Sequence, residues 1–195
     1  MRVVEYGHEG FKNEWLDLVN EDPIHPSIDV EKRIIGSRTI FIMVDENEIP
    51  QAVLCVKMGD RLPQSMRFVM GDQKSEDINL KSKYAILYSV FRLKQSTVKG
   101  AGAMIIKLVK EYYKAKYIKR FYTLSPITDL TQRFNAIPSK ADIIRHLLSG
   151  EGPVSKFHVG NGASIHAIHF NADTSSQRIY ESWGIMVNYD YSDYV

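Results

Sequence analysis

The segment with the most local chemistry covers residues 94–103 and reads Lys-Gln-Ser-Thr-Val-Lys-Gly-Ala-Gly-Ala. It follows an apolar, β-branched stretch at residues 84–93 and precedes an amphipathic stretch at residues 104–115. This order predicts a strand, a small-residue turn and a helix, and the backbone amides at the positive end of such a helix can hold a phosphate. The same glycines can also merely shape a tight connection, and a short Gly-rich turn does not decide between the two.

Ser125 is a second candidate, because it ends the short apolar run of residues 121–124 and precedes Pro126. A strand, a helix and a further strand in sequence imply a crossover, and therefore a parallel or splayed pair of strands. Ligands are expected where the ends of such strands open, and Ser125 stands at one of these ends. A Ser-Pro pair is also common at simple turns and helix starts, so this position remains ambiguous by itself.

Three histidines, His158, His166 and His169, lie close together at steps of eight and three residues. Neither step gives the i, i+4 spacing of a helical zinc pair, so we predict no metal site. Asn161-Gly162 is a strong turn signal, which places His158 just before a hairpin-like bend and predicts a strand after it. A lone histidine beside a turn is more often a surface or structural residue than a catalytic one, and local physics does not settle its role.

Apolar periodicity predicts the elements that must position these residues. We expect helices at residues 11–20, 29–35 and 141–149, the last closed by Gly150, and strands at residues 38–45, 51–58, 84–93 and 121–124. The strands at 38–45 and 51–58 form a predicted hairpin, and the charged residues 71–83 form a predicted exposed loop. These elements indicate an α/β fold in one domain over residues 1–195.

The composition of the chain limits the kinds of ligand and partner that it can bind. Lys and Arg number 25 and Asp and Glu number 23, a net charge of +2 that favours a small anionic ligand over a nucleic-acid surface. The one cysteine, Cys55, allows neither an internal disulfide nor a multi-cysteine metal site, and its apolar surroundings predict a buried core residue. We see no signal peptide and no apolar stretch of the ~20 residues that span a bilayer, so we expect a soluble, cytoplasmic protein without a membrane partner.

Three blocks resemble the malonyl-CoA decarboxylase family in the family's order: Phe-Tyr-Thr-Leu-Ser-Pro-Ile at 121–127, Phe-His-Val-Gly-Asn-Gly-Ala at 157–163 and Gly-Ile-Met-Val-Asn-Tyr-Asp-Tyr at 184–191. Weaker similarity extends upstream through residues 24–26, 50–62 and 97–107. The resemblance implies a GNAT-like acyltransferase fold, in which a mixed central sheet with splayed parallel strands admits the pantetheine arm of coenzyme A and is flanked by helices. It makes residues 1–195 a single catalytic domain, without the helical N-terminal domain of full-length members.

The resemblance also implies roles for residues. Ser125 matches the family's active-site serine and His158 matches its catalytic histidine. The turn becomes the cradle for the CoA pyrophosphate, formed by Thr97, Val98, Lys99, Gly100, Ala101, Gly102 and Ala103. Gly100 stands where the family usually has an acidic residue.

The implied reaction is decarboxylation of malonyl-CoA, or a related malonyl thioester, to acetyl-CoA and CO₂. An enolate forms and is protonated by His158, whose imidazole is expected to carry the required proton near neutral pH. Ser125 would hydrogen-bond the malonyl carboxylate or relay the proton. The substrate is the CoA thioester itself, with no tightly bound cofactor, and an acyl carrier protein is a further expected partner.

Two alternatives remain open at this stage. One is a GNAT-type acyltransferase that moves an acyl group from CoA to an amine, a hydroxyl or a carrier-protein thiol. The other is a non-catalytic acyl-CoA-binding regulatory module, which would have no chemical need for both Ser125 and His158. The sequence leaves the acyl-chain specificity and the oligomeric state undetermined.

Overall fold

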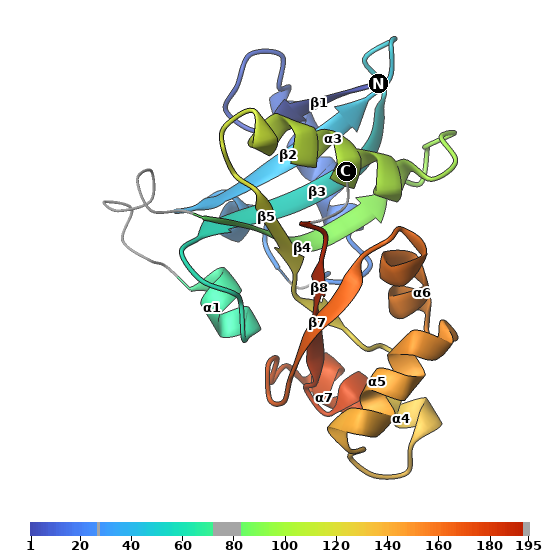
Figure 1. Cartoon of the computed structure of the whole chain (residues 1–195). Helices are drawn as coiled ribbons and strands as arrows, with labels where there is room; N and C mark the ends of the chain where they lie inside the picture. The colour runs from blue at the N-terminus through green and yellow to red at the C-terminus, as the bar shows by residue number, and fades with distance from the viewer. Residues whose placement is uncertain (27, 72–82, 193–195) are drawn as a thin grey trace. The chain divides into compact units, whose positions relative to one another are not determined.

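The computed structural model describes residues 1–26, 28–71 and 83–192, and these divide into two compact units (Figure 1). The first unit comprises residues 1–61 and 83–119, and the second comprises residues 62–71 and 120–192. The loop predicted at 71–83 lies outside the described residues except for its two ends. The expectation of one domain over the whole chain stays a prediction.

The first unit contains four antiparallel strands in chain order: β1 (Arg2–Glu5), β2 (Arg38–Val44), β3 (Pro50–Gly59) and β4 (Tyr84–Arg92). β2 and β3 form the predicted hairpin, and β4 confirms the strand expected at 84–93. Runs of Ile, Val, Leu and Phe bury almost completely in these strands, because apolar β-branched and aromatic side chains pack well on a pleated surface. Cys55 lies in this core, as predicted.

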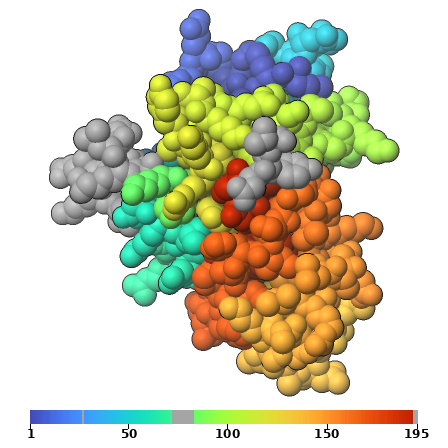
Figure 2. Space-filling model, in the orientation of Figure 1, coloured from blue at the N-terminus to red at the C-terminus, as the bar shows by residue number. Residues whose placement is uncertain are grey.

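Helix α3 (Ala101–Lys114) packs against β3 and β4 and forms part of the surface of this unit (yellow-green in Figure 2). Its buried side carries Ile105, Val109 and Tyr113, while Lys107 and Glu111 are exposed. The helix begins three residues earlier than the amphipathic pattern predicted, because the small residues 101–103 continue the helical turn.

The two other helices predicted in this unit are shorter or of another type. Residues 13–21 form the 3₁₀ helix η1 (Asn13–Glu21), which buries Trp15 and Val19 but has no side-chain cap at its start. Residues 31–33 form the 3₁₀ turn η2 (Glu31–Arg33), where Arg33 is buried and its guanidinium bonds the Asp22 carboxylate at 2.8 Å. Both segments are therefore shaped by tertiary anchoring more than by helical periodicity.

The second unit is built around strand β8 (Met186–Asp190), which pairs antiparallel with three strands. These are β5 (Arg120–Thr123), β6 (Ser125–Pro126) and β7 (Ser164–His169). β5 confirms the strand predicted at 121–124, and Leu124 alone separates it from β6. β7 confirms the strand expected after the Asn161-Gly162 turn.

Five helices complete the second unit: α1 (Met66–Met70), α4 (Leu130–Arg133), α5 (Lys140–Ser149), α6 (Pro153–Gly160) and α7 (Ser176–Ser182). α5 matches the predicted helix and ends at Gly150 as expected. α6 corrects the sequence interpretation, which treated residues 151–153 as loop and expected no helix here; Pro153 is well suited to the first position of a helix. His158 does precede the turn at Asn161-Gly162, as predicted, but it does so from the last turn of α6.

None of the helices in the described part of the chain combines the length and the apolar character that a membrane-spanning segment needs.

Candidate active site

Ser125 lies on the short strand β6, opposite Val187 of β8, and is 7% exposed. Its hydroxyl donates a hydrogen bond to the Thr123 hydroxyl oxygen at 2.9 Å. The same Thr123 oxygen accepts the backbone N–H of Tyr189 at 3.2 Å. The serine hydroxyl is therefore held by side-chain and backbone bonds from β5 and β8, which are both paired elements of the sheet.

His158 reaches Ser125 from the last turn of α6, with its Nε2 atom 3.0 Å from the Ser125 Oγ atom. Its other ring nitrogen, Nδ1, lies 2.8 Å from the Tyr191 hydroxyl. The ring stacks on Tyr189, with centroids 4.4 Å apart and planes at 26°. His158 is 4% exposed, so both nitrogens are satisfied by protein groups and the ring has a fixed orientation.

The protonation states follow from this burial. Burial lowers the pKa of His158 to about 3, so its imidazole is neutral near pH 7. Burial also raises the pKa of Tyr191, so the phenol keeps its proton and can donate it to Nδ1. The Nε2 atom then carries the ring proton and donates to Ser125. These bonds form a directed chain of hydrogen bonds from Tyr191 through His158 and Ser125 to Thr123.

This result differs from the sequence-based expectation that His158 carries an exchangeable proton near neutral pH. A solvent-exposed imidazole has a pKa near 6.5, whereas the buried ring of His158 has none of that solvation. The resting site therefore holds one ring proton, on Nε2, and a second proton must come with a change in the surroundings of the ring.

Asn188 supports this arrangement from β8, where it is fully buried. Its Nδ2 atom donates to the backbone oxygens of Thr123 at 2.7 Å and Pro63 at 3.1 Å. Because both amide protons are used, its Oδ1 atom accepts from His169 Nε2 at 2.6 Å. Asn188 thus fixes the strand end that carries Thr123, and His169 is tied to it.

The remaining histidine of the cluster plays a different part. His166 is exposed on β7, and its ring lies edge-on to Tyr122 with centroids 5.0 Å apart. Within the described residues there is no group of three histidine, cysteine or acidic side chains placed to hold a metal ion.

The predicted CoA turn, residues 97–103, belongs to the first unit. Gly100 is the N-cap of α3 with φ of 73°, a left-handed conformation that side-chain-bearing residues rarely adopt. It has no side chain to cap the first amides of the 14-residue helix. The amides of Thr97 and Val98 already bond Gln51 Oε1 and Ser96 Oγ, both at 3.2 Å. The amides that stay suited to a phosphate are those of the first helical residues, 101–103, because the amide of Met104 already bonds the Gly100 carbonyl oxygen at 3.0 Å.

The structure therefore brings Ser125 and His158 together, and it places the turn at a helix N-terminus as predicted. Sequence reasoning missed the partners of the pair: Thr123, Tyr189 and Tyr191. A signal was present, because Tyr189 lies on β8 and Tyr191 follows directly after the end of that strand. Residues two apart along extended backbone face the same side of a sheet.

Comparisons with known proteins bear on this site. Residues 144–194 match the family model described as the malonyl-CoA decarboxylase C-terminal domain, a segment that includes His158, Tyr189 and Tyr191. A comparison with curated proteins gave no match.

Many solved structures share the fold, and three of them follow in turn. Malonyl-CoA decarboxylase from Rhodopseudomonas palustris is 19% identical with a TM-score of 0.75, over 98% of this chain and 60% of that one. The loading GNATL domain of CurA from Lyngbya majuscula is 15% identical with a TM-score of 0.67, over 98% of each chain. The GNAT-like decarboxylase GphF, in complex with isobutyryl-CoA, is 14% identical with a TM-score of 0.59, over 98% of this chain and 99% of that one.

This chain spans about 60% of the length of the decarboxylase structure that it matches. The α/β class and the GNAT-like fold are confirmed by these neighbours. The chain thus has a GNAT-like fold, and its predicted resemblance to malonyl-CoA decarboxylase is confirmed by the match of residues 144–194 to that family's C-terminal domain.

Proposed function

We propose that this protein decarboxylates a malonyl thioester of coenzyme A to acetyl-CoA and CO₂, with Ser125 and His158 as the catalytic residues. The observation that carries the proposal is the buried Ser125–His158 pair, 3.0 Å apart. The match of residues 144–194 to the decarboxylase C-terminal domain supports the same reaction. A protein that only bound an acyl-CoA would gain nothing from a desolvated serine–histidine pair, so the regulatory-module alternative is disfavoured.

The reaction consumes one proton, and a resting His158 that is neutral does not supply it without first gaining one. Cleavage of the bond between the carboxylate carbon and the methylene carbon releases CO₂ and leaves an electron pair on an enolate. One proton must then be added to the methylene carbon, and it comes from solvent overall. In our proposal the malonyl carboxylate lies beside Ser125, where its negative charge favours the protonated form of His158. A proton therefore enters the site with the substrate.

After CO₂ leaves, the Nε2 proton of His158 is passed through the Ser125 hydroxyl to the enolate carbon. The neutral ring then keeps its Nδ1 proton, which it donates to the Tyr191 hydroxyl oxygen, until proton exchange restores the resting form with the proton on Nε2. Tyr191 keeps the ring in the orientation that points Nε2 at Ser125. Because burial favours the neutral ring, the extra proton is held only while the substrate charge is present. We further propose that the start of α3 binds the CoA pyrophosphate through its backbone amides.

Acyl transfer is the second candidate. A neutral imidazole can also remove the proton of a serine within hydrogen-bond distance and activate a nucleophile. In this site that role requires the ring proton of His158 to move from Nε2 to Nδ1, so that Nε2 can accept. In that case an amine, a hydroxyl or a carrier-protein thiol would receive the acyl group.

Incubation of the purified protein with malonyl-CoA in D₂O, without any acceptor, separates these candidates. We expect acetyl-CoA whose methyl group carries one deuterium, detected by mass spectrometry, together with stoichiometric CO₂. Unchanged malonyl-CoA would contradict the decarboxylase proposal, and consumption only after an acceptor is added would favour acyl transfer. The double variant Ser125→Ala, His158→Asn serves as the control for spontaneous decarboxylation.

A further inference from the structure

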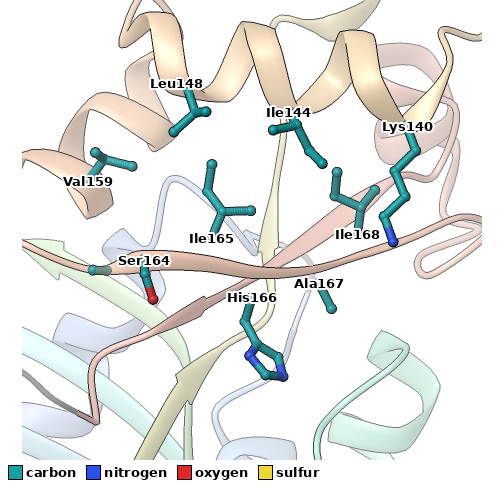
Figure 3. A pocket seen from close by; sticks show the side chains of 10 residues that line it. Lys140, Ile144, Leu148, Val159, Ser164, Ile165, His166, Ala167 and Ile168 are labelled. Atoms are coloured by element: carbon teal, nitrogen blue, oxygen red, sulfur yellow. The ribbon is translucent and has the colours of Figure 1, made fainter.

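A groove outside the Ser125–His158 site runs between helix α5 and strand β7, entirely within the second unit (Figure 3). Its volume is about 390 Å³, which lies in the size range of small-molecule sites. Aliphatic side chains form most of its wall: Ile144, Leu148, Val159, Ile165 and Ile168. Leu148 lies at the rim of the groove and is 64% exposed, so much of this large apolar side chain faces solvent.

A bulge in β7 creates the floor of this groove. The pairing of β7 with β8 shifts register between Ile165 and Ala167. Because of this shift, Ile165 and Ile168 both point toward α5, whereas His166 points away from the helix (Figure 3). A regular strand would alternate its side chains and could not place residues three apart on one face.

Helix α5 provides the opposite wall with residues four apart, which lie on one face of a helix: Lys140, Ile144 and Leu148. From Lys140 to Leu148 the helix advances about 12 Å, so the groove is elongated along the helix axis. Its apolar walls are continuous from Leu148 and Val159 at one end to Ile168 at the other (Figure 3).

The charge in the groove lies at one end. Lys140 extends from the first turn of α5 toward β7 beside Ile168 (Figure 3). It forms no ion pair with any of the described residues, and the nearby Asp142 carboxylate already bonds Ser139 and Arg145. An elongated apolar groove with one unpaired ammonium group at its end is complementary to an alkyl chain with one anionic head group.

We propose that the α5–β7 groove binds a medium-length alkyl carboxylate, with its chain between α5 and β7 and its carboxylate against Lys140. This site is separate from the proposed decarboxylation, and its test does not depend on turnover. A single cation at one end, without alternating charges along the rim, favours a small amphiphile over a protein segment.

Binding can be measured by isothermal titration calorimetry with octanoate, octanol and octylamine on the intact chain. Octanoate should bind in a saturable, one-to-one manner, octanol more weakly, and octylamine more weakly than octanol because its charge repels Lys140. Leu148→Glu should weaken octanoate binding at least about tenfold, through lost apolar contact and like charge. Lys140→Gln should weaken octanoate binding about fivefold and leave octanol binding unchanged.

The matched controls are Ile137→Glu and Lys156→Gln, which change exposed residues of the same unit outside the groove lining. Both should bind octanoate like the wild type. Equal binding of octanoate and octylamine, or octanoate binding that neither Leu148→Glu nor Lys140→Gln weakens, would overturn the proposal. Self-association of the wild type that Leu148→Glu abolishes would also overturn it, because a second copy of the chain would then cover the groove.

Discussion

The Ser125–His158 pair offers buried side chains as its functional groups, whereas the turn before α3 offers backbone amides. Ser125 and His158 are buried, and neighbouring side chains fix both ring nitrogens and the serine hydroxyl. The turn is largely exposed, and the groups it offers are backbone amides that Gly100 leaves uncapped. The first region depends on residue identity, whereas the second depends on the absence of side chains.

This difference predicts how each region responds to mutation. Removing a side chain from the buried pair should slow the chemical step strongly and leave ligand binding intact. Adding a side chain to the turn should weaken CoA binding and leave the chemical step intact. The predictions below test this contrast in order of decreasing expected effect.

The largest effect is expected for His158→Asn. General acid catalysis by a positioned side chain contributes about 10²–10⁴-fold, so the rate of CO₂ release from malonyl-CoA should fall by this range. CoA affinity, measured by calorimetry, should change little. Near-wild-type CO₂ release by this variant would remove the proposed mechanism.

The structure also decides which histidine is the proper control. His166 is exposed and His166→Asn should retain wild-type turnover. His169 is a poorer control, because it bonds Asn188, which holds the Thr123 backbone.

Ser125→Ala should have the next largest effect, a loss of turnover of about 10²-fold with CoA affinity retained. The hydroxyl is the group through which the Nε2 proton of His158 would reach the substrate. Ser164→Ala, at an exposed position on β7, provides a control for the loss of a serine hydroxyl. Because the proposed decarboxylation needs no acyl-enzyme, an acyl group trapped on Ser125 and detected by mass spectrometry would favour the acyltransferase instead.

Gly102→Val should weaken CoA binding about tenfold, because its bulk would crowd the amides at the start of α3. The rate at saturating malonyl-CoA should remain close to that of the wild type. Met104→Val places the same side chain at an exposed position of the same helical turn and should bind CoA normally. If folded Gly102→Val bound CoA with unchanged affinity by calorimetry, the proposal that the turn binds CoA would be wrong.

The fold was predictable wherever an element carries a clear apolar pattern, either a continuous apolar run or a helical period. The hairpin of β2 and β3 and the strand β4 follow from long β-branched runs that the core buries. The eight-residue helix α6 was missed, because so short a segment has little periodicity and its start is marked only by Pro153.

The two main residues of the site could be predicted from the sequence, but the protonation state of His158 could not. Local physics left Ser125 and His158 ambiguous, and the resemblance selected both. The low pKa of His158 depends on burial by α6 and β8, and burial of one residue by distant segments cannot be read from local sequence. Tyr191 lies in the resembling block at 184–191, but that block does not show that its hydroxyl contacts Nδ1 of His158 and leaves Nε2 to face Ser125.

The smallest expected effect is on the pH dependence of the melting temperature, which tests the burial of His158 directly. The pKa of His158 is about 3 in the folded protein and about 6.5 when unfolded, so below pH 6.5 the unfolded chain binds more protons. The resulting stabilisation is fully present above pH 6.5 and is lost as the pH falls from 6.5 toward 3. Within that window the melting temperature should fall by a few degrees per pH unit because of this residue. Melting curves between pH 7.5 and about 4.5 avoid most carboxylate titration.

His158→Asn should melt lower at pH 7.5, because it loses buried bonds, but its melting temperature should depend less steeply on pH. If the two proteins had the same slope, His158 would not be buried in its neutral form, and the proposal that the substrate brings its proton would fail.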